Sequence, residues 1–100
     1  MTAQSVDTFE DAAAQARASG TPFLSELGPY ILAAVTLGAA RDTRSLARVL
    51  GVAHALVIRE CNSLGEELGL LEIEDRGDRS QRVFVSLSDT GAALFGGGAR

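Results

Sequence analysis

Three polar side chains, His54, Arg59 and Asn62, lie in a short segment that has a helical pattern. Arg59 and Asn62 are three positions apart, a spacing that makes two side chains neighbours on a helix surface. A guanidinium group can form paired hydrogen bonds with guanine, and a carboxamide can form them with adenine. The spacing therefore predicts that Arg59 and Asn62 contact bases from one face of a helix. His54, near the start of that helix, either contacts a phosphate or covers the preceding turn.

The nine basic residues are all arginines, and they are unevenly distributed. Residues 41–48 hold three arginines and one aspartate, a local charge of +2. Residues 75–82 hold three arginines and two aspartates, a local charge of +1. Arginines gathered in this way are suited to phosphate contacts. The phosphate candidates are Arg44, Arg76, Arg79 and Arg82.

The whole chain is acidic, with a net charge of −4. Four of the glutamates between the two basic segments lie close to the second segment, at positions 66, 67, 72 and 74. Domains that grip nucleic acid strongly are usually basic, so this total predicts weak non-specific binding. Segregation of the charge leaves the two basic segments available for phosphate contacts.

The cysteine and histidine content restricts the catalytic and metal chemistry. Cys61 is the only cysteine and His54 is the only histidine. A four-cysteine zinc site is excluded, and a serine or cysteine hydrolase would have to build its base from His54. The glycine run at 96–98 follows no strand pattern, unlike a phosphate-binding loop. We expect no enzyme, no metal and no cofactor.

Cys61 has two interpretations of its own. A redox-sensing thiol should be exposed and close to positive charge, which lowers its pKa. Cys61 instead follows Glu60 and falls on an apolar stripe with Val57 and Leu64. The stripe favours a small core residue over a sensor.

The first 40 residues predict helices that support the rest of the chain. Asp7 is the expected N-cap of a first helix that Gly20 ends. A short turn over Phe23–Leu27 is expected to stop at Gly28, and a longer helix is expected from Pro29 to Ala39. The apolar stretch within residues 30–40 is shorter than the roughly 18 residues that span a bilayer.

Residues 42–69 predict two helices joined by a tight turn. Asp42 or Thr43 should cap the first helix, whose apolar face is Leu46, Val49 and Leu50, and Gly51 should end it. The second helix is expected from about Ala53 to Leu68. Its apolar stripe recurs at helical spacing, and Gly69 is the expected stop. The stripe consists of Val57, Cys61, Leu64 and Leu68.

The pattern changes from helical to alternating after Gly69. We expect a hairpin with Leu70–Asp75 paired to Arg82–Leu87, joined by a charged loop that contains Gly77. Ser88 should cap a short closing helix over Asp89–Phe95. The predicted fold is one α+β, mainly α, domain over residues 1–100: a winged helix-turn-helix with a two-stranded wing. Its parts are the N-terminal helices (1–40), the helix-turn-helix (42–69), the wing (70–87), and a short helix with a tail (88–100).

Several short motifs resemble the MarR (multiple-antibiotic-resistance regulator) family of winged helices. Ser45–Val52 is similar to that family's Leu-Ala-x-x-Leu-Gly core, and Leu64–Leu71 resembles its helix end and strand start. Asp78-Arg79-Ser80 and Val83–Gly91 resemble its Asp-Arg wing and Leu-Thr-x-x-Gly sequence. The resemblance covers about residues 27–95. It implies a homodimeric, DNA-binding transcriptional regulator in which Arg79 of the wing contacts double-stranded DNA.

A second hypothesis follows from Leu56 and Ile58, two apolar residues on the helix that carries Arg59. Exposed apolar groups are typical of protein-binding surfaces, so the alternative is a winged-helix interaction module that binds a protein partner and not DNA. The N-terminal residues lack the basic and apolar regions of a secretory signal. We therefore expect a cytoplasmic protein that makes no use of a membrane.

Overall fold

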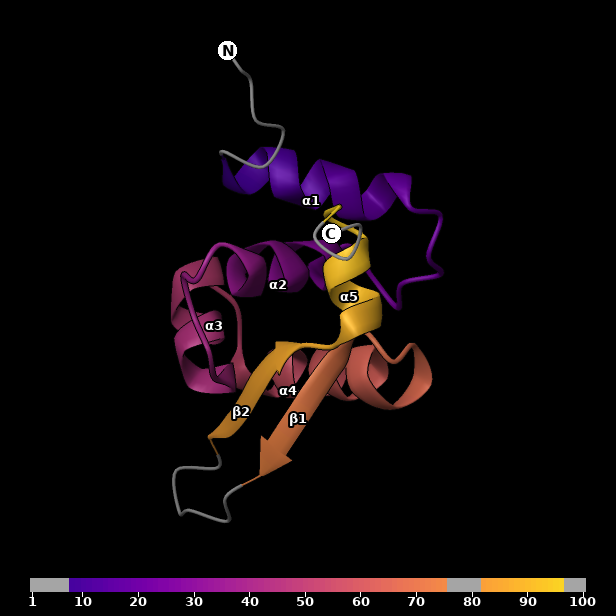
Figure 1. Cartoon of the computed structure of the whole chain (residues 1–100). Helices are drawn as coiled ribbons and strands as arrows, with labels where there is room; N and C mark the ends of the chain where they lie inside the picture. The colour runs from indigo at the N-terminus through magenta and orange to yellow at the C-terminus, as the bar shows by residue number, and fades with distance from the viewer. Residues whose placement is uncertain (1–7, 76–81, 97–100) are drawn as a thin grey trace.

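The computed structural model describes residues 8–75 and 82–96. Along these residues the elements follow one another as five α-helices, one π-helical segment and two strands (Figure 1). They are α1 (Phe9–Ala18), α2 (Leu27–Thr36), α3 (Thr43–Leu50), α4 (His54–Asn62), the π-helical segment η1 (Ser63–Glu67), β1 (Leu71–Asp75), β2 (Val83–Leu87) and α5 (Asp89–Ala93). The chain is thus α+β and mainly helical, as the sequence predicts.

Helix α1 lies against α2 through small side chains. Ala12, Ala13 and Ala33 are fully buried between the two helices. At one end of this contact the rings of Phe9 and Tyr30 stack with centroids 5.3 Å apart. The N-cap of α1 is Thr8, whose hydroxyl accepts a hydrogen bond from the amide of Asp11 at 3.0 Å. The prediction of Asp7 as the cap is wrong by one position, because threonine can fill the same role.

Helix α2 begins earlier than the sequence predicts. It starts at Leu27, so Pro29 lies inside its first turn and does not begin the helix. Proline is tolerated there because the first amides of a helix have no intrahelical acceptor. Phe23–Leu27 therefore forms no separate helical turn. The helix ends at Thr36, and Gly38 follows with a φ of +75°.

Helices α3 and α4 are joined by a turn of three residues, as predicted. Asp42 caps α3 by accepting a hydrogen bond from the Ser45 amide at 2.8 Å. Gly51 ends α3 with a φ of +70°, a left-handed conformation that side chains disfavour. The amides of Gly51 and Val52 both donate to the Ala47 carbonyl, at 2.9 and 3.1 Å. These bonds fix the angle at which the chain enters α4.

The end of the predicted second helix is π-helical, which corrects the expectation of one α-helix up to Leu68. The Leu68 amide donates to the Ser63 carbonyl at 3.0 Å, a bond that spans five residues. Gly65 of η1 lies against β1, where an added Cβ would come within 2.5 Å of the Ile73 side chain. A larger residue at position 65 would push the helical segment away from the sheet.

The two strands form the predicted antiparallel hairpin, and each begins one residue later than predicted, at Leu71 and at Val83. Leu71 is opposite Leu87, and Ile73 is opposite Val85. These four side chains form the inner face of the hairpin and pack on the core. Ser88 caps α5 by accepting a hydrogen bond from the Gly91 amide at 3.0 Å, and α5 ends at Ala93, two residues before the predicted end.

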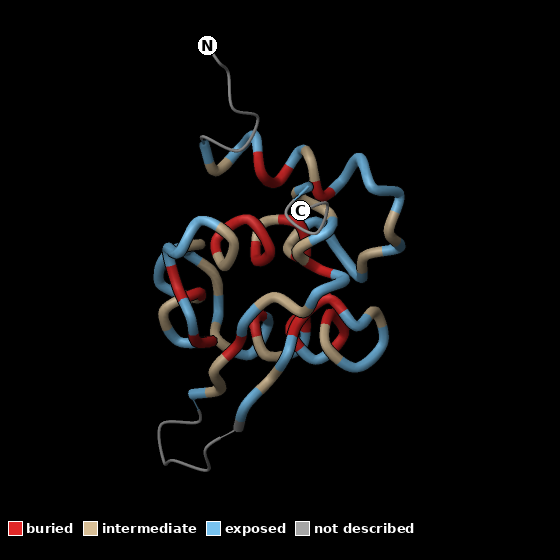
Figure 2. Tube along the Cα trace, viewed as in Figure 1, coloured by how far each residue is buried: buried red, intermediate tan, exposed pale blue. Residues whose placement is uncertain are grey.

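The core lies where α2, α3, α4 and the inner face of the hairpin meet (Figure 2). Ile31, Leu46 and Val57 are completely buried, and Leu64 is 1% exposed. The predicted stripe on the second helix is confirmed, with Leu68 at its edge. One apolar prediction is wrong: Val49 of α3, expected on the buried face with Leu46, is 49% exposed.

Candidate nucleic-acid interface

Helix α4 divides into a buried face and an exposed face. Val57 and Cys61 are buried, whereas Leu56, Ala55, Arg59 and Asn62 are exposed. Ala55, Arg59 and Asn62 follow one another at spacings of four and three, which places them on one side of the helix. We call these three residues the α4 face. Arg59 and Asn62 therefore share one exposed surface, as their spacing predicts. None of the exposed residues of α4 carries a carboxylate. The first exposed carboxylate after α4 is that of Glu66 in η1.

The start of α4 is fixed by a buried threonine. Thr43 is completely buried, and its hydroxyl accepts a hydrogen bond from the Val83 amide of β2 at 3.1 Å. The same hydroxyl lies 2.8 Å from His54 Nε2. One side chain thus joins α3, α4 and β2, and sequence analysis did not identify it. A hydroxyl can both donate and accept, so it can accept from Val83 and bond with either tautomer of His54.

His54 is turned toward this junction. It is half-buried, and its Nε2 is hydrogen-bonded with Thr43 of α3. Desolvation lowers the pKa of His54, the positive charge of Arg44 lowers it further, and Asp42 opposes the shift. A neutral ring is therefore favoured near pH 7. The hypothesis of a phosphate contact by His54 stays a prediction.

The phosphate candidates divide between described and undescribed residues. Arg44, in the first turn of α3, and Arg82, directly before β2, are both exposed. Their chain neighbours Thr43 and Val83 are hydrogen-bonded, so the two arginines lie in one region of the molecule. Arg76 and Arg79 lie outside the described residues. A basic region thus adjoins the start of α4.

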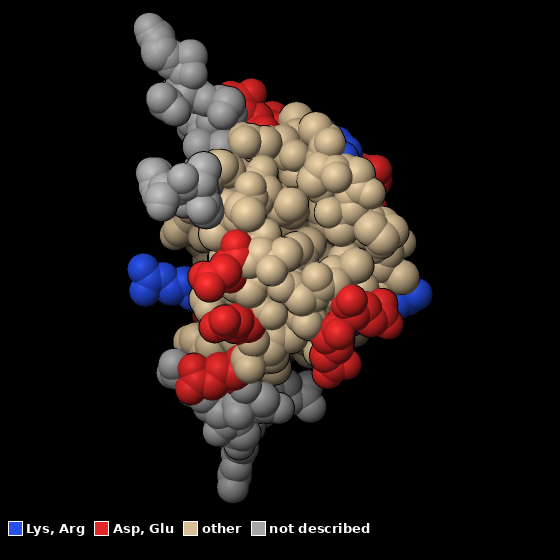
Figure 3. All heavy atoms as spheres, turned by 45° about the vertical axis from the view of Figure 1, so that its right-hand side comes forward, with Lys and Arg blue, Asp and Glu red and all other residues tan. Residues whose placement is uncertain are grey.

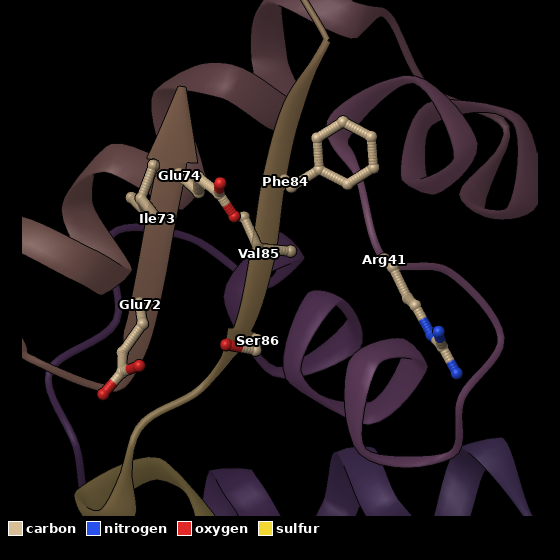
Figure 4. Close-up of a pocket in the computed structure, with 7 residues that line it drawn as sticks. All are labelled: Arg41, Glu72, Ile73, Glu74, Phe84, Val85 and Ser86. Atoms are coloured by element: carbon tan, nitrogen blue, oxygen red, sulfur yellow. The ribbon is translucent and has the colours of Figure 1, made fainter. Parts of the chain in front are cut away.

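The outer face of the hairpin carries negative charge, in contrast to the basic region at the start of α4. Glu72 and Glu74 are exposed there, opposite Ser86 and Phe84 on the neighbouring strand. With Arg41 these residues border a hollow of about 360 Å³, shown in Figure 4. In that view both carboxylates come from β1, whereas Phe84 and Arg41 lie on the other side of β2. Carboxylates on this face repel phosphate groups.

The segregation of charge can be followed on the molecular surface. Figure 3 shows several acidic side chains in the lower half of the face that it displays, with few basic ones beside them. Among the described residues, Glu66, Glu67, Glu72 and Glu74 are exposed. The charged side chains are therefore not spread evenly over the described surface.

Leu56, which looks out of place beside Arg59 in the sequence, borders a cavity of about 260 Å³. This cavity lies between α4 and the segment before α2, and we call it the α2–α4 cavity. It is lined by Leu24, Ser25, Leu27, Val52, Leu56, Arg59 and Glu60. Sequence analysis did not identify it as a site. The sign of this cavity in the sequence is Glu60. It lies three positions after Val57 and four before Leu64, a spacing that places a charged residue on the same side of the helix as the buried stripe.

Cys61 is buried among the core residues, as predicted. Burial raises the pKa of its thiol to about 12, and the neighbouring Glu60 adds to the increase. A thiol in this state has almost no thiolate at neutral pH, which disfavours redox sensing. Within residues 8–75 and 82–96, no group of three histidine, cysteine or acidic side chains is placed to hold a metal ion. In the same ranges no helix is long and apolar enough to cross a membrane.

Comparison with known proteins found no protein-family model, no curated protein and no solved structure that matches this chain.

Proposed function

We propose that this protein is a transcriptional regulator that binds double-stranded DNA as a winged helix-turn-helix domain. In this proposal α4 enters the major groove, and the hairpin lies along the backbone or the minor groove. The observation that carries the proposal is the α4 face. Arg59 and Asn62 are exposed together on a helix whose other side is anchored in the core.

The surroundings of α4 support the same proposal. The turn after Gly51 and the hydrogen bonds of Thr43 hold the first turn of α4 in a fixed place. Arg44 and Arg82 supply positive charge beside it, where phosphates would flank a groove occupied by the helix. The MarR-like motifs add the proposal of a homodimer, in which two copies of α4 contact two half-sites about one helical turn apart.

A second candidate function is a winged-helix module that binds a protein and not DNA. It is favoured by three large apolar side chains that are about half exposed: Leu24 at 47%, Val49 at 49% and Leu56 at 47%. Large apolar groups at a surface are typical of protein interfaces. The basic region near α4 has no part in this alternative, which is why we rank it second.

A titration with a pool of random DNA duplexes separates the two functions. We expect binding at about 50 mM salt that weakens steeply at about 200 mM salt, because counterions are released when phosphates are contacted. Arg44→Ala should weaken the binding to all sequences alike, and Arg79→Ala should do the same and lower the salt slope by about 1. Absence of binding at low salt, together with a protein that co-purifies and is lost on substitution of Leu56 or Ile58, would favour the interaction module.

A further inference from the structure

Glu60 has a buried carboxyl group in which only one of the two oxygens has a hydrogen-bond partner among the described residues. Its side chain is 5% exposed, in a helix whose neighbouring buried residues are apolar. Oε2 accepts a hydrogen bond from the Ser25 hydroxyl at 2.5 Å. Oε1 is buried, and no donor among the described residues reaches it. A buried acceptor without a partner is costly, so such an atom points to a missing donor.

Ser25 cannot supply that donor. Its hydroxyl already donates to Glu60 Oε2 and accepts a hydrogen bond from the Leu27 amide at 3.1 Å. The serine thereby fixes the start of α2 against α4 and holds the carboxyl group in one orientation. Glu60 is also one of the residues that line the α2–α4 cavity.

The walls of this cavity are mainly apolar. Leu24, Leu27, Val52 and Leu56 line it, and Leu24 and Leu56 are each 47% exposed. The polar residues of the lining are Ser25, Glu60 and Arg59, and Arg59 itself is exposed. Ligand sites commonly combine an apolar lining with a few polar groups that fix orientation. A volume of about 260 Å³ suits a small molecule and not a large cofactor.

We propose that the α2–α4 cavity binds a small apolar amine. Its protonated nitrogen donates to Glu60 Oε1, and its hydrocarbon body packs against Leu24 and Leu56. An ammonium group has donors only, which matches an acceptor oxygen, and charge assistance strengthens the bond. A ligand carboxylate in the same place would lie against the Glu60 carboxyl group and be rejected. This site does not depend on DNA binding, and its residues other than Arg59 lie outside the α4 face.

The test uses three probes with the same ring and different polar ends: 2-phenylethylamine, 2-phenylethanol and 3-phenylpropionate. Binding to the full chain is measured by protein-observed NMR titration without nucleic acid. We expect the amine to bind saturably at millimolar concentration and at least about tenfold more tightly than the alcohol, because its hydrogen bond is charge-assisted. The carboxylate should not bind. Residues of the cavity should show the largest shifts.

Two variants and a control locate the binding. Glu60→Gln should weaken amine binding by at least about tenfold, since the charge is lost while the side-chain volume is kept. Glu66→Gln removes an exposed carboxylate of η1 outside the cavity and should leave the affinity unchanged. Leu56→Ala changes a half-exposed wall residue, so it should fold and bind the amine several-fold more weakly.

The probe series on the unaltered chain decides the question even if Glu60→Gln does not fold. Equal affinity for amine and alcohol, or no saturable binding of the amine, would overturn the proposal and leave a cavity filled by water. An equal loss of affinity in Glu60→Gln and Glu66→Gln would also overturn it, because it would mean general attraction to an acidic protein. These outcomes leave the proposed DNA binding untouched, since no nucleic acid takes part.

Discussion

The α4 face and the outer face of the hairpin belong to one packed unit but differ in charge. The α4 face presents Arg59 and Asn62, whereas the outer hairpin face presents Glu72 and Glu74. Each lies opposite side chains that are buried in the common core, Val57 in one case and Val85 in the other. The net charge of the chain therefore says little about either surface. For binding to a polyanion, the local charge of the contacting face decides.

The largest expected effect is on the stability of the core that supports both surfaces. Leu64 is 1% exposed in the core on which α4, η1 and the hairpin pack. Leu64→Ala should lower the free energy of unfolding by about 2 to 5 kcal/mol, because a buried leucine leaves a cavity. Denaturant unfolding measures the change, and Leu68→Ala at the partly buried edge of the stripe is the matched control with a smaller loss. An unchanged midpoint for Leu64→Ala would mean that α4 is oriented differently.

The next effect concerns the α4 face alone. Arg59→Ala should weaken binding to the preferred DNA site by about 1 to 3 kcal/mol and reduce discrimination at one base pair, because a paired contact with guanine is lost. Fluorescence anisotropy with the preferred duplex and a single-base variant measures both quantities. Arg17→Ala, at an arginine that is paired with Glu26 at 3.6 Å, changes the same charge away from α4 and should have little effect. A loss that is equal for all sequences would assign Arg59 to a phosphate.

A smaller effect is expected on the outer hairpin face. The double variant Glu72→Gln, Glu74→Gln should strengthen DNA binding by less than about 1 kcal/mol at low salt, since exposed charges at a distance act weakly. The gain should vanish near about 0.15 M salt, where the screening length is about 8 Å. If the gain persists at that salt, the hairpin's outer face itself lies against DNA.

The smallest effect is a dependence of stability on pH through His54. Its pKa is lowered in the folded protein, so the unfolded chain binds a proton more readily. Stability should be complete above the unfolded value of 6.5 and decrease as pH falls below it. Thermal midpoints between about pH 7.5 and pH 5.5 measure the decrease, because His54 is the only histidine. His54→Gln should flatten the profile. A midpoint that rises on acidification would contradict the direction of the shift.

The sequence predicts correctly those features of the fold that depend on residues close together in the chain. Asp42 as a cap, Gly51 as a helix stop and the alternation of β1 depend on residues close together in the chain. The π-helical segment escaped prediction, because Leu64 faces the core in either helix type. The exposure of Val49 was not predicted, because an apolar residue at helical spacing can still face solvent at the edge of a helix–helix contact.

The candidate sites were predictable to different degrees. The shared face of Arg59 and Asn62 follows from a spacing of three and is confirmed. The pairing of Ser25 with Glu60 spans 35 positions, and no periodic pattern carries such a contact. The same holds for Thr43 and Val83, which are 40 positions apart. A charged residue on an apolar stripe was the one local sign of the α2–α4 cavity.

The most direct test of the central claim maps which surface lies against DNA. A photo-crosslinker is attached at Asn62→Cys on the α4 face and, in a second variant, at Glu72→Cys on the outer hairpin face. Cys61 should remain unlabelled under native conditions, because its thiol is buried and its pKa is raised to about 12. We predict crosslinks to a labelled duplex from position 62 and none from position 72. Crosslinks from position 72 alone, or from neither position at low salt, would contradict binding of DNA through α4.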